Sequence, residues 1–230
     1  MTGPDKHGHD NHDHDHGHGH VHRHDHDHAR TFQPDIEDAP FGQYQVMAQA
    51  LGEVLIDKGV ITPDEMREQL EWLDARSPSD GARLVARAWT DPKFKALLLN
   101  DVNAAAQSAG LSAGDIPIRA IENTPEVHNV VVCTLCSCYP RGLLGLPPDW
   151  YKSREYRSRT VREPRAILAE FGTVIADDVE VRVHDSTADL RYLVLPMRPA
   201  GTEGMGAAAL EELVTRDCMI GVSLPRTPRP

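Results

Sequence analysis

Three of the four cysteines in this 230-residue chain stand close together, at Cys133, Cys136 and Cys138. A thiolate is a soft ligand, and three of them within one turn suit a transition metal better than a disulfide. The nearly continuous apolar run 127–132 comes directly before them and predicts a buried strand. Such a strand would fix the backbone of the cysteine loop while the loop stays open on one side. The fold therefore has to place this strand in a core and the cysteines at its end.

The spacing of the cysteines allows five donors to reach one metal ion. Cys136 and Cys138 are two residues apart, so both sulfurs can lie on one side of the backbone, with the peptide nitrogens of Ser137 and Cys138 between them. A strongly Lewis-acidic trivalent metal that displaced these two amide protons would hold two sulfurs and two nitrogens in one plane. Neither nitrogen belongs to a proline, so both are available. Cys133 would bind from below the plane, which leaves one position open, as a catalytic metal requires.

Two other interpretations of the cysteines stay open on spacing alone. A structural zinc site would need a fourth ligand, for which His128 and Cys218 are the candidates. We expect both of these residues to be buried for packing instead. Cys133 and Cys136 also have the spacing of a redox pair, although the strand and helix start typical of thioredoxin are not evident. The loop by itself therefore indicates a metal site without identifying the metal.

A longer pattern around this loop resembles the alpha subunit of nitrile hydratase. The pattern spans roughly residues 45 to 222 and is most specific in the cysteine loop. The matching segments lie at 132–140, 144–152, 156–159, 161–165, 198–204 and 214–222. The gamma subunit of thiocyanate hydrolase carries the same cysteine loop, so the chain is similar to both.

The resemblance implies a role for each residue of the loop. Cys133 would be the axial thiolate, while Cys136 and Cys138 would be oxidised to sulfinic and sulfenic acid. Ser137 and Cys138 would donate their deprotonated amide nitrogens. The catalytic residues would be Cys138, Cys136 and Ser137, with the sulfenate oxygen of Cys138 acting as a nucleophile or a base.

The resemblance also implies the metal and the partners. Members of the family with threonine at the position of Thr134 generally hold non-corrin cobalt(III), and those with serine hold iron(III). Cobalt is therefore expected, and iron is the less favoured metal. The family precedent adds a beta subunit, whose two arginines hydrogen-bond the oxidised sulfurs. A metallochaperone or activator is a further expected partner.

One position after the loop bears on the substrate. Typical nitrile hydratases have a tryptophan after the Tyr-Pro pair, whereas this chain has Arg141, as thiocyanate hydrolases do. An arginine near an open metal position favours an anion such as thiocyanate, and a solvated or interface arginine is the other interpretation. The segments 123–129 and 161–165 look more like nitrile hydratase, although the glutamine that many of its members carry upstream is replaced here by the segment 113–114. The leading hypothesis is hydration of a small nitrile to the amide, and its close rival is hydrolysis of thiocyanate to carbonyl sulfide and ammonia.

The first 30 residues form a low-complexity tail in which histidine alternates with aspartate or glycine. Such a tract cannot bury a core and is predicted to be disordered. Imidazoles at this density bind divalent cobalt, nickel, copper or zinc. The tail could deliver cobalt to the loop, bind metals nonspecifically or be a purification tag. The aspartate and glycine residues between the histidines disfavour a tag. A non-catalytic protein that only buffers metal is the rival to the enzyme hypothesis. The predicted accessory ligands are His12, His14, His16, His18, His20, His22, His24, His26 and His28.

Helical patterns occupy the segment between the tail and the buried strand. Apolar residues recur at helical spacing from about Phe41 to Gly59, and Thr62 with Glu65 predicts a capping box at the start of a second helix. Further helical stripes run to about residue 110, with one helix expected from Asp91 onward. These helices lack a large aromatic core of their own, so we expect them to pack on a partner subunit. The family resemblance implies the same arrangement with the beta subunit.

Local patterns after the loop predict a basic helix and two strands. The stretch 152–165 is rich in arginine but is interrupted by acidic residues, so it is interpreted as a solvated or subunit-facing helix with internal ion pairs. The segments 179–183 and 192–195 are predicted to pair with each other across the turn 185–189.

Together these patterns predict an α+β fold with a helical N-terminal arm and a compact mixed domain that carries the metal loop. We expect a disordered tail at 1–40, the helical arm at 41–111 and the metal-site domain at 112–225. A net charge of −11 and a pI near 5.6 argue against nucleic acid as a partner. The chain contains no apolar run long enough to span a membrane and begins without a signal peptide, so a reducing cytoplasm is expected.

Overall fold

A computed structural model of the chain describes residues 42–228, and within this range it contains both helices and strands, which confirms the expected α+β class. By contacts the chain divides into two units, residues 1–54 and 55–230. The helix α1 (Gln43–Asp57) lies largely in the first unit, and Gly59 with a φ of 66° follows its end, as predicted. None of the helices in the described range combines the length and apolar character that a membrane span needs.

The second unit opens with α2 (Pro63–Asp74), which has the predicted capping box. The Thr62 hydroxyl accepts a hydrogen bond from the backbone N–H of Glu65, and the Glu65 carboxylate accepts one from the backbone N–H of Thr62. The next helices are α3 (Pro78–Thr90), α4 (Pro92–Asn100) and α5 (Val102–Ser108). The single helix expected after Asp91 is therefore divided in two, because the Asp101 side chain caps a new helix by accepting from the backbone N–H of Ala104.

The helices α3, α4 and α5 share one hydrophobic core with the strands. Leu84 and Val85 on α3, Leu98 on α4 and Val102 on α5 are all fully buried in the cluster that contains the strand residues. The expected domain boundary between residues 111 and 112 therefore does not separate two cores in the described structure. In contrast, α2 has no buried residue.

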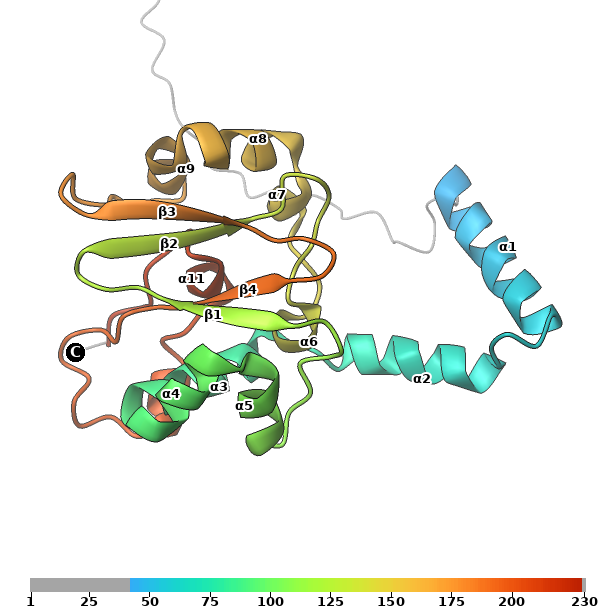
Figure 1. The fold of residues 1–230 in the computed structure, drawn as a ribbon, viewed down its shortest axis with the longest axis horizontal. Coiled ribbons are helices and arrows are strands. Elements are labelled where there is room, and N and C mark those ends of the chain that lie inside the picture. The colour runs from blue at the N-terminus through green and yellow to red at the C-terminus, as the bar shows by residue number, and fades with distance from the viewer. Residues whose placement is uncertain (1–41, 229–230) are drawn as a thin grey trace, which may run out of the picture. The chain divides into compact units, whose positions relative to one another are not determined.

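Among residues 42–228, four short strands form two parallel pairs. They are β1 (Ile118–Glu122), β2 (Val127–Val132), β3 (Glu180–Asp185) and β4 (Arg191–Leu195). β1 pairs with β4 and β2 pairs with β3, while β2 and β4 lie next to each other between them, so that the order in Figure 1 is β3, β2, β4, β1. The prediction that β3 and β4 form a hairpin is wrong. Alternating polarity identifies a half-buried strand but does not identify the strand it pairs with. In the structure β3 pairs with the buried strand β2, and the chain then crosses over so that β4 pairs with β1.

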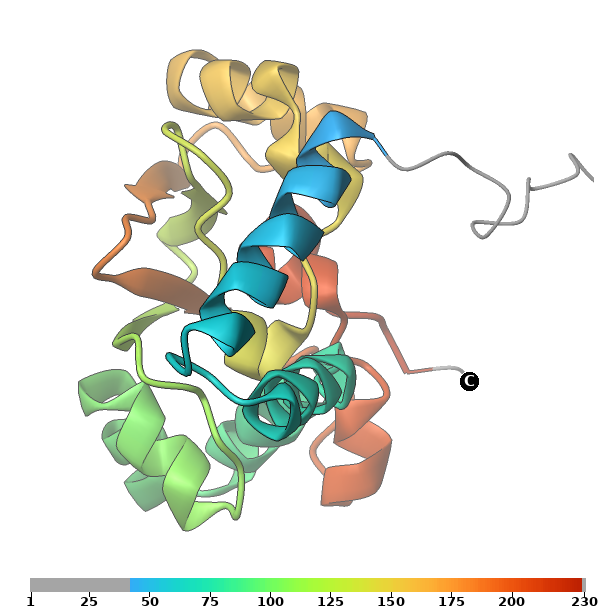
Figure 2. The same ribbon diagram turned by 90° about the vertical axis from the view of Figure 1, so that its right-hand side faces the viewer.

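Helices cover both ends of this row of strands. The helices that follow the cysteine loop are α6 (Arg141–Leu144), α7 (Asp149–Lys152), α8 (Arg154–Arg162), α9 (Pro164–Glu170), α10 (Ala207–Glu211) and α11 (Arg216–Ile220). The tan α8 and α9 lie beside β3, and the green α4 and α5 lie at the opposite end near β1 (Figures 1 and 2). α11 packs on β2 and β4, and it ends at Gly221 with a φ of 90°. A Cβ on Gly221 would stand 2.0 Å from the carbonyl oxygen of Asn129, so only glycine allows this approach to β2.

Candidate metal centre

The cysteine loop begins where β2 ends, as the sequence predicts. Cys133 is fully buried directly after Val132, while Cys136 is exposed and Cys138 is half-buried. The Sγ atoms of Cys133 and Cys136 are 3.5 Å apart, and those of Cys136 and Cys138 are 3.2 Å apart. All three sulfurs lie within 4.8 Å of one another, and none of the four cysteines forms a disulfide. The loop therefore presents three thiols to one point.

The sulfur spacing tests which metal geometry the loop fits. Two thiolates bound at about 2.3 Å to one metal would stand about 3.3 Å apart at a right angle and about 3.8 Å apart in a tetrahedron. The observed 3.2 and 3.5 Å therefore fit two thiolates that share one metal ion. Both candidates for a fourth zinc ligand are engaged elsewhere: His128 Nε2 donates to the Gly221 carbonyl oxygen, and Cys218 Sγ donates to the Thr215 carbonyl oxygen. Neither candidate therefore completes a four-ligand zinc site with the three sulfurs.

The thiols of Cys136 and Cys138 have different pKa values. Hydrogen bonding with Cys138 is the main cause that lowers the pKa of the Cys136 thiol to about 7, and Cys133 and the backbone amides of Ser137 and Cys138 contribute in the same direction. Burial raises the pKa of Cys138 to about 12, against the opposing charge of Arg191. Cys136 therefore ionises before Cys138. The backbone amides that act on it are the two nitrogens expected to complete the donor plane.

Side chains from distant elements hold the backbone of the loop. The carboxylate of Asp185, at the end of β3, accepts hydrogen bonds from the backbone N–H and the hydroxyl of Thr134 at 2.9 and 2.5 Å. Arg157 Nη1 on α8 donates to the carbonyl oxygens of Leu135 and Cys136 at 3.0 and 3.2 Å. The loop is thus held at its start and middle by two charged groups, which orient it before any metal binds.

Two buried tyrosines hold the backbone on either side of the loop. Tyr151 donates from its hydroxyl to the carbonyl oxygen of Cys138 at 2.8 Å, and Tyr156 donates to that of Val131 at 2.7 Å. Burial is the main cause that raises the pKa of both tyrosines well above the usual range, so both hydroxyls keep the protons that they donate. Their rings pack with that of Trp150, whose centroid lies 4.9 Å from the Tyr156 ring. An aromatic cluster therefore stabilises the frame of the loop.

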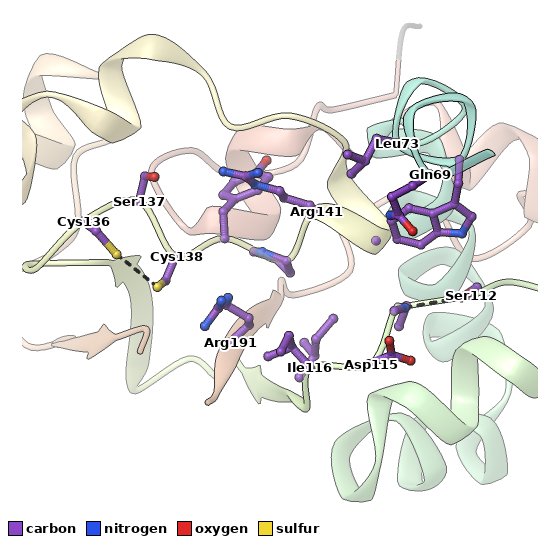
Figure 3. Close-up of a pocket in the computed structure, with 17 residues that line it drawn as sticks. Gln69, Leu73, Ser112, Asp115, Ile116, Cys136, Ser137, Cys138, Arg141 and Arg191 are labelled. Atoms are coloured by element: carbon purple, nitrogen blue, oxygen red, sulfur yellow. Dashed lines mark hydrogen bonds between the residues drawn. The ribbon is translucent and has the colours of Figure 1, made fainter. Parts of the chain in front are cut away.

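The exposed side of the loop opens into a cleft of about 660 Å³ (Figure 3). The residues 136–142 form one wall, and Arg191 of β4, the segment 112–116 and residues of α2 line the rest. The predicted substrate residue Arg141 lies in this cleft, and the segment 113–114, noted for its missing glutamine, also lines it. Gly142 is required here, since a Cβ would stand 2.1 Å from the carbonyl oxygen of Ala113. The cleft gives a small molecule access to Cys136 and Cys138.

Sequence reasoning missed four residues of this site. Asp185, Arg157, Tyr151 and Arg191 all contact the loop or its cleft. Asp185 could have been found from its place at the carboxyl end of a strand, had the parallel pairing with β2 been predicted. The other three carry no local signal, because arginines and tyrosines are common throughout the segment after the loop. The histidines predicted as accessory ligands, from His12 to His28, lie outside the described residues.

Comparisons with known proteins agree with these features. The family described as "Nitrile hydratase, alpha chain" matches residues 42–223. The low-molecular weight cobalt-containing nitrile hydratase subunit alpha of Rhodococcus rhodochrous is 51% identical over 183 residues, which cover 78% of this chain and 88% of that protein. The thiocyanate hydrolase subunit gamma of Thiobacillus thioparus is 40% identical over 205 residues, or 84% of each chain. A solved structure of recombinant thiocyanate hydrolase with partially modified cobalt centres superposes with a TM-score of 0.76 at 39% identity, covering 83% of this chain and 96% of that one.

Proposed function

Because the chain belongs to the nitrile hydratase alpha-chain family, we propose that it is the cobalt-holding subunit of an enzyme that hydrates a nitrile to the amide. The observation that carries this proposal is the group of three sulfurs, 3.2 and 3.5 Å apart, at the mouth of an open cleft. Cys133, Cys136, Ser137 and Cys138 would hold non-corrin cobalt(III), and iron(III) is the less favoured metal. The cobalt-containing relatives support this choice.

The proposed chemistry divides between the metal and the chain. Bound cobalt would supply Lewis acidity towards the nitrile or a water molecule. Asp185 and Arg157 keep the loop in one conformation, so that the sulfurs do not need to reorganise during turnover. In its oxidised form Cys138 would offer a sulfenate oxygen at the cleft as the nucleophile or as the base that takes a proton from water. The cleft would bind the substrate beside this oxygen. Arg141 would then lie near the carbon chain of a nitrile or near the negative charge of thiocyanate.

A second subunit is part of the proposal. Leu135, in the middle of the cysteine loop, is 88% exposed, and Val161 on the basic helix α8 is 52% exposed. On α1 the apolar residues Tyr44, Met47 and Leu51 follow one another at helical spacing, and each is more than half exposed. Exposed apolar side chains of this kind favour burial against a partner. A beta subunit that packed on them would also bring its arginines to the oxidised sulfurs.

Hydrolysis of thiocyanate is the second candidate reaction. Arg141 favours it, because a cation in the cleft attracts an anionic substrate, and the gamma subunit of thiocyanate hydrolase is among the relatives. The two candidates differ in the charge of the substrate, so they can be separated by one residue. Arg141→Trp would remove the cation and give the side chain typical of nitrile hydratases.

The test is an assay of the full chain purified with the subunits that accompany it, with a small nitrile and thiocyanate compared in the same sample and cobalt quantified. We expect amide formation and about one tightly held cobalt per chain, in keeping with a single three-sulfur site. Arg141→Trp should leave nitrile turnover within a few-fold and abolish any turnover of thiocyanate. Turnover of thiocyanate alone by the unaltered chain would instead establish the second candidate, and absence of both activities with cobalt bound would contradict the proposal.

The histidine-rich tail would serve this enzyme as a metal supply. The chain has 13 histidines, and only His128 and His184 lie beyond residue 28. Borderline imidazole ligands hold cobalt(II) reversibly, and tethering to the same chain keeps the ion at a high effective concentration near the loop. An activator protein and a cytoplasmic location belong to the same proposal. If the chain were only a metal buffer, its metal would be lost with the tail.

A further inference from the structure

Arg191 is a cation in the cleft that the proposed function does not use. It is the first residue of β4, in register with Ile118 of β1, and its backbone N–H donates to the carbonyl oxygen of Pro117 at 2.9 Å. Its side chain extends into the cleft beside Cys138 (Figure 3). A strand therefore fixes the backbone of Arg191, so its guanidinium reaches the cleft from a rigid element.

The guanidinium of Arg191 has an unused donor. Its Nη1 atom is buried and has no hydrogen-bond partner within residues 42–228. In the same range no carboxylate forms an ion pair with it, although Asp115 lines the same cleft. A buried charged donor without an acceptor destabilises a folded protein, so such a group is retained where an anion completes it. The site around Arg191 therefore needs an acceptor with negative charge.

Cys138 can supply that acceptor. Cys138 is half-buried and lines the same cleft, and the Arg191 side chain lies beside it (Figure 3). A thiolate, or the oxygen of an oxidised sulfur, is the kind of anion that a guanidinium binds with two parallel hydrogen bonds. Arg141, the other arginine that lines the cleft, is also a cation and cannot accept.

We propose that Arg191 is a positioning residue that donates hydrogen bonds to the negatively charged sulfur group of Cys138 and so holds this ligand in place for the metal. This inference rests on the proposed metal site. It gives the chain its own arginine for Cys138, in addition to the arginines implied for the partner subunit. Arg191 then acts on the metal site through Cys138.

The test compares Arg191→Met, Arg191→Lys and a control, Arg119→Met, in the full chain purified with its accompanying subunits. Arg119 is an exposed arginine on the neighbouring strand β1 and lies outside the cleft. The readouts are cobalt per chain after a chelator challenge, the sulfur-to-cobalt absorption band and the mass of the peptide that contains Cys138. Changes to groups that orient metal ligands lower metal affinity about 10- to 100-fold. We expect such a loss and a shifted band for Arg191→Met, substantial rescue by Arg191→Lys, and unaltered behaviour of Arg119→Met.

The outcomes separate the inference from the proposed function. If the unaltered chain holds no cobalt, the proposed function fails, and the inference fails with it. If the unaltered chain holds cobalt and Arg191→Met holds it equally well with the same band, only the inference is overturned. Equal loss in the Met and Lys variants together with a lower melting temperature would mean that Arg191 stabilises the fold alone, which also overturns it. If Arg191→Met loses cobalt even when cobalt is loaded without air, the acceptor is the Cys138 thiolate. If it loses cobalt only after loading in air, the acceptor is the oxidised sulfur of Cys138. Both results support the inference.

Discussion

Removing the carboxylate of Asp185 should loosen the cysteine loop while the fold remains intact. Asp185→Ala deletes the acceptor of two hydrogen bonds from Thr134, at 2.9 and 2.5 Å. Hydrogen bonds to a charged group contribute about 1.5–3 kcal/mol each, but both residues are exposed, so solvent screening reduces the pair to about 2 kcal/mol together. Since about 1.4 kcal/mol is a factor of ten, the ordered loop should become about 30-fold less populated relative to disordered conformations. Cobalt affinity should fall by up to the same factor, because only the ordered loop binds the metal.

The measurement is competition for cobalt between the full-chain complex and a chelator of known affinity, with the melting temperature recorded on the same samples. Thr134→Val removes only the hydroxyl bond and should lose about half of the free energy, whereas Thr134→Ser keeps both donors and should bind cobalt nearly as tightly as the unaltered chain. Asp178→Ala, in the exposed turn before β3, is the matched control. Equal cobalt affinity for Asp185→Ala and Asp178→Ala would refute the reasoning that this carboxylate orders the loop.

Three further predictions follow from the same structure. Cys136→Ser should abolish tightly held cobalt, whereas Cys218→Ser should leave cobalt content unaltered, because Cys218 Sγ bonds to Thr215 and is not part of the three-sulfur group; cobalt analysis that finds equal loss in both would contradict the site. Deletion of residues 2–30 should leave about one cobalt per chain in excess metal but slow its uptake at low cobalt concentration, and loss of all cobalt would favour a metal buffer. The free energy of unfolding, measured with urea, should decrease as the pH falls below about 6.5, because burial lowers the pKa of His128 and His184 in the folded state and the unfolded chain then binds more protons. A flat profile between pH 7.5 and 5.5 would contradict the burial of neutral histidines.

Local chemistry was sufficient to predict the elements nearest the metal site. The apolar run before the cysteines predicted β2 with its observed bounds, because a strand buried on both faces has an almost continuous apolar sequence. Thr62 and Glu65 predicted a capping box, since this motif depends only on residues three apart. The spacing of Cys133, Cys136 and Cys138 likewise predicted three sulfurs around one point.

Features that depend on distant residues were not predictable in this way. The pairing of β3 with β2 and of β4 with β1 is decided by burial across the whole core, and the sequence of 179–195 alone is equally compatible with a hairpin. The helices α3 to α5 resemble a partner-binding arm in their composition, yet their apolar faces pack on the strands. Asp185 and Arg191 reach the site only because of the strand crossing, so no local pattern marks them.

The sequence distance between the cysteines and the groups that orient them has a consequence for the order of assembly. Thr134 is bonded to a carboxylate 51 residues later in the chain, and Cys136 to a guanidinium 21 residues later. Long-range contacts of this kind form late in folding, after the intervening chain has been synthesised and its loops have closed. The cysteines thus leave the ribosome before their supporting residues exist. Cobalt insertion at this loop should accordingly be a post-translational step on a folded subunit, and the interval before it is when these thiols are most vulnerable to uncontrolled oxidation.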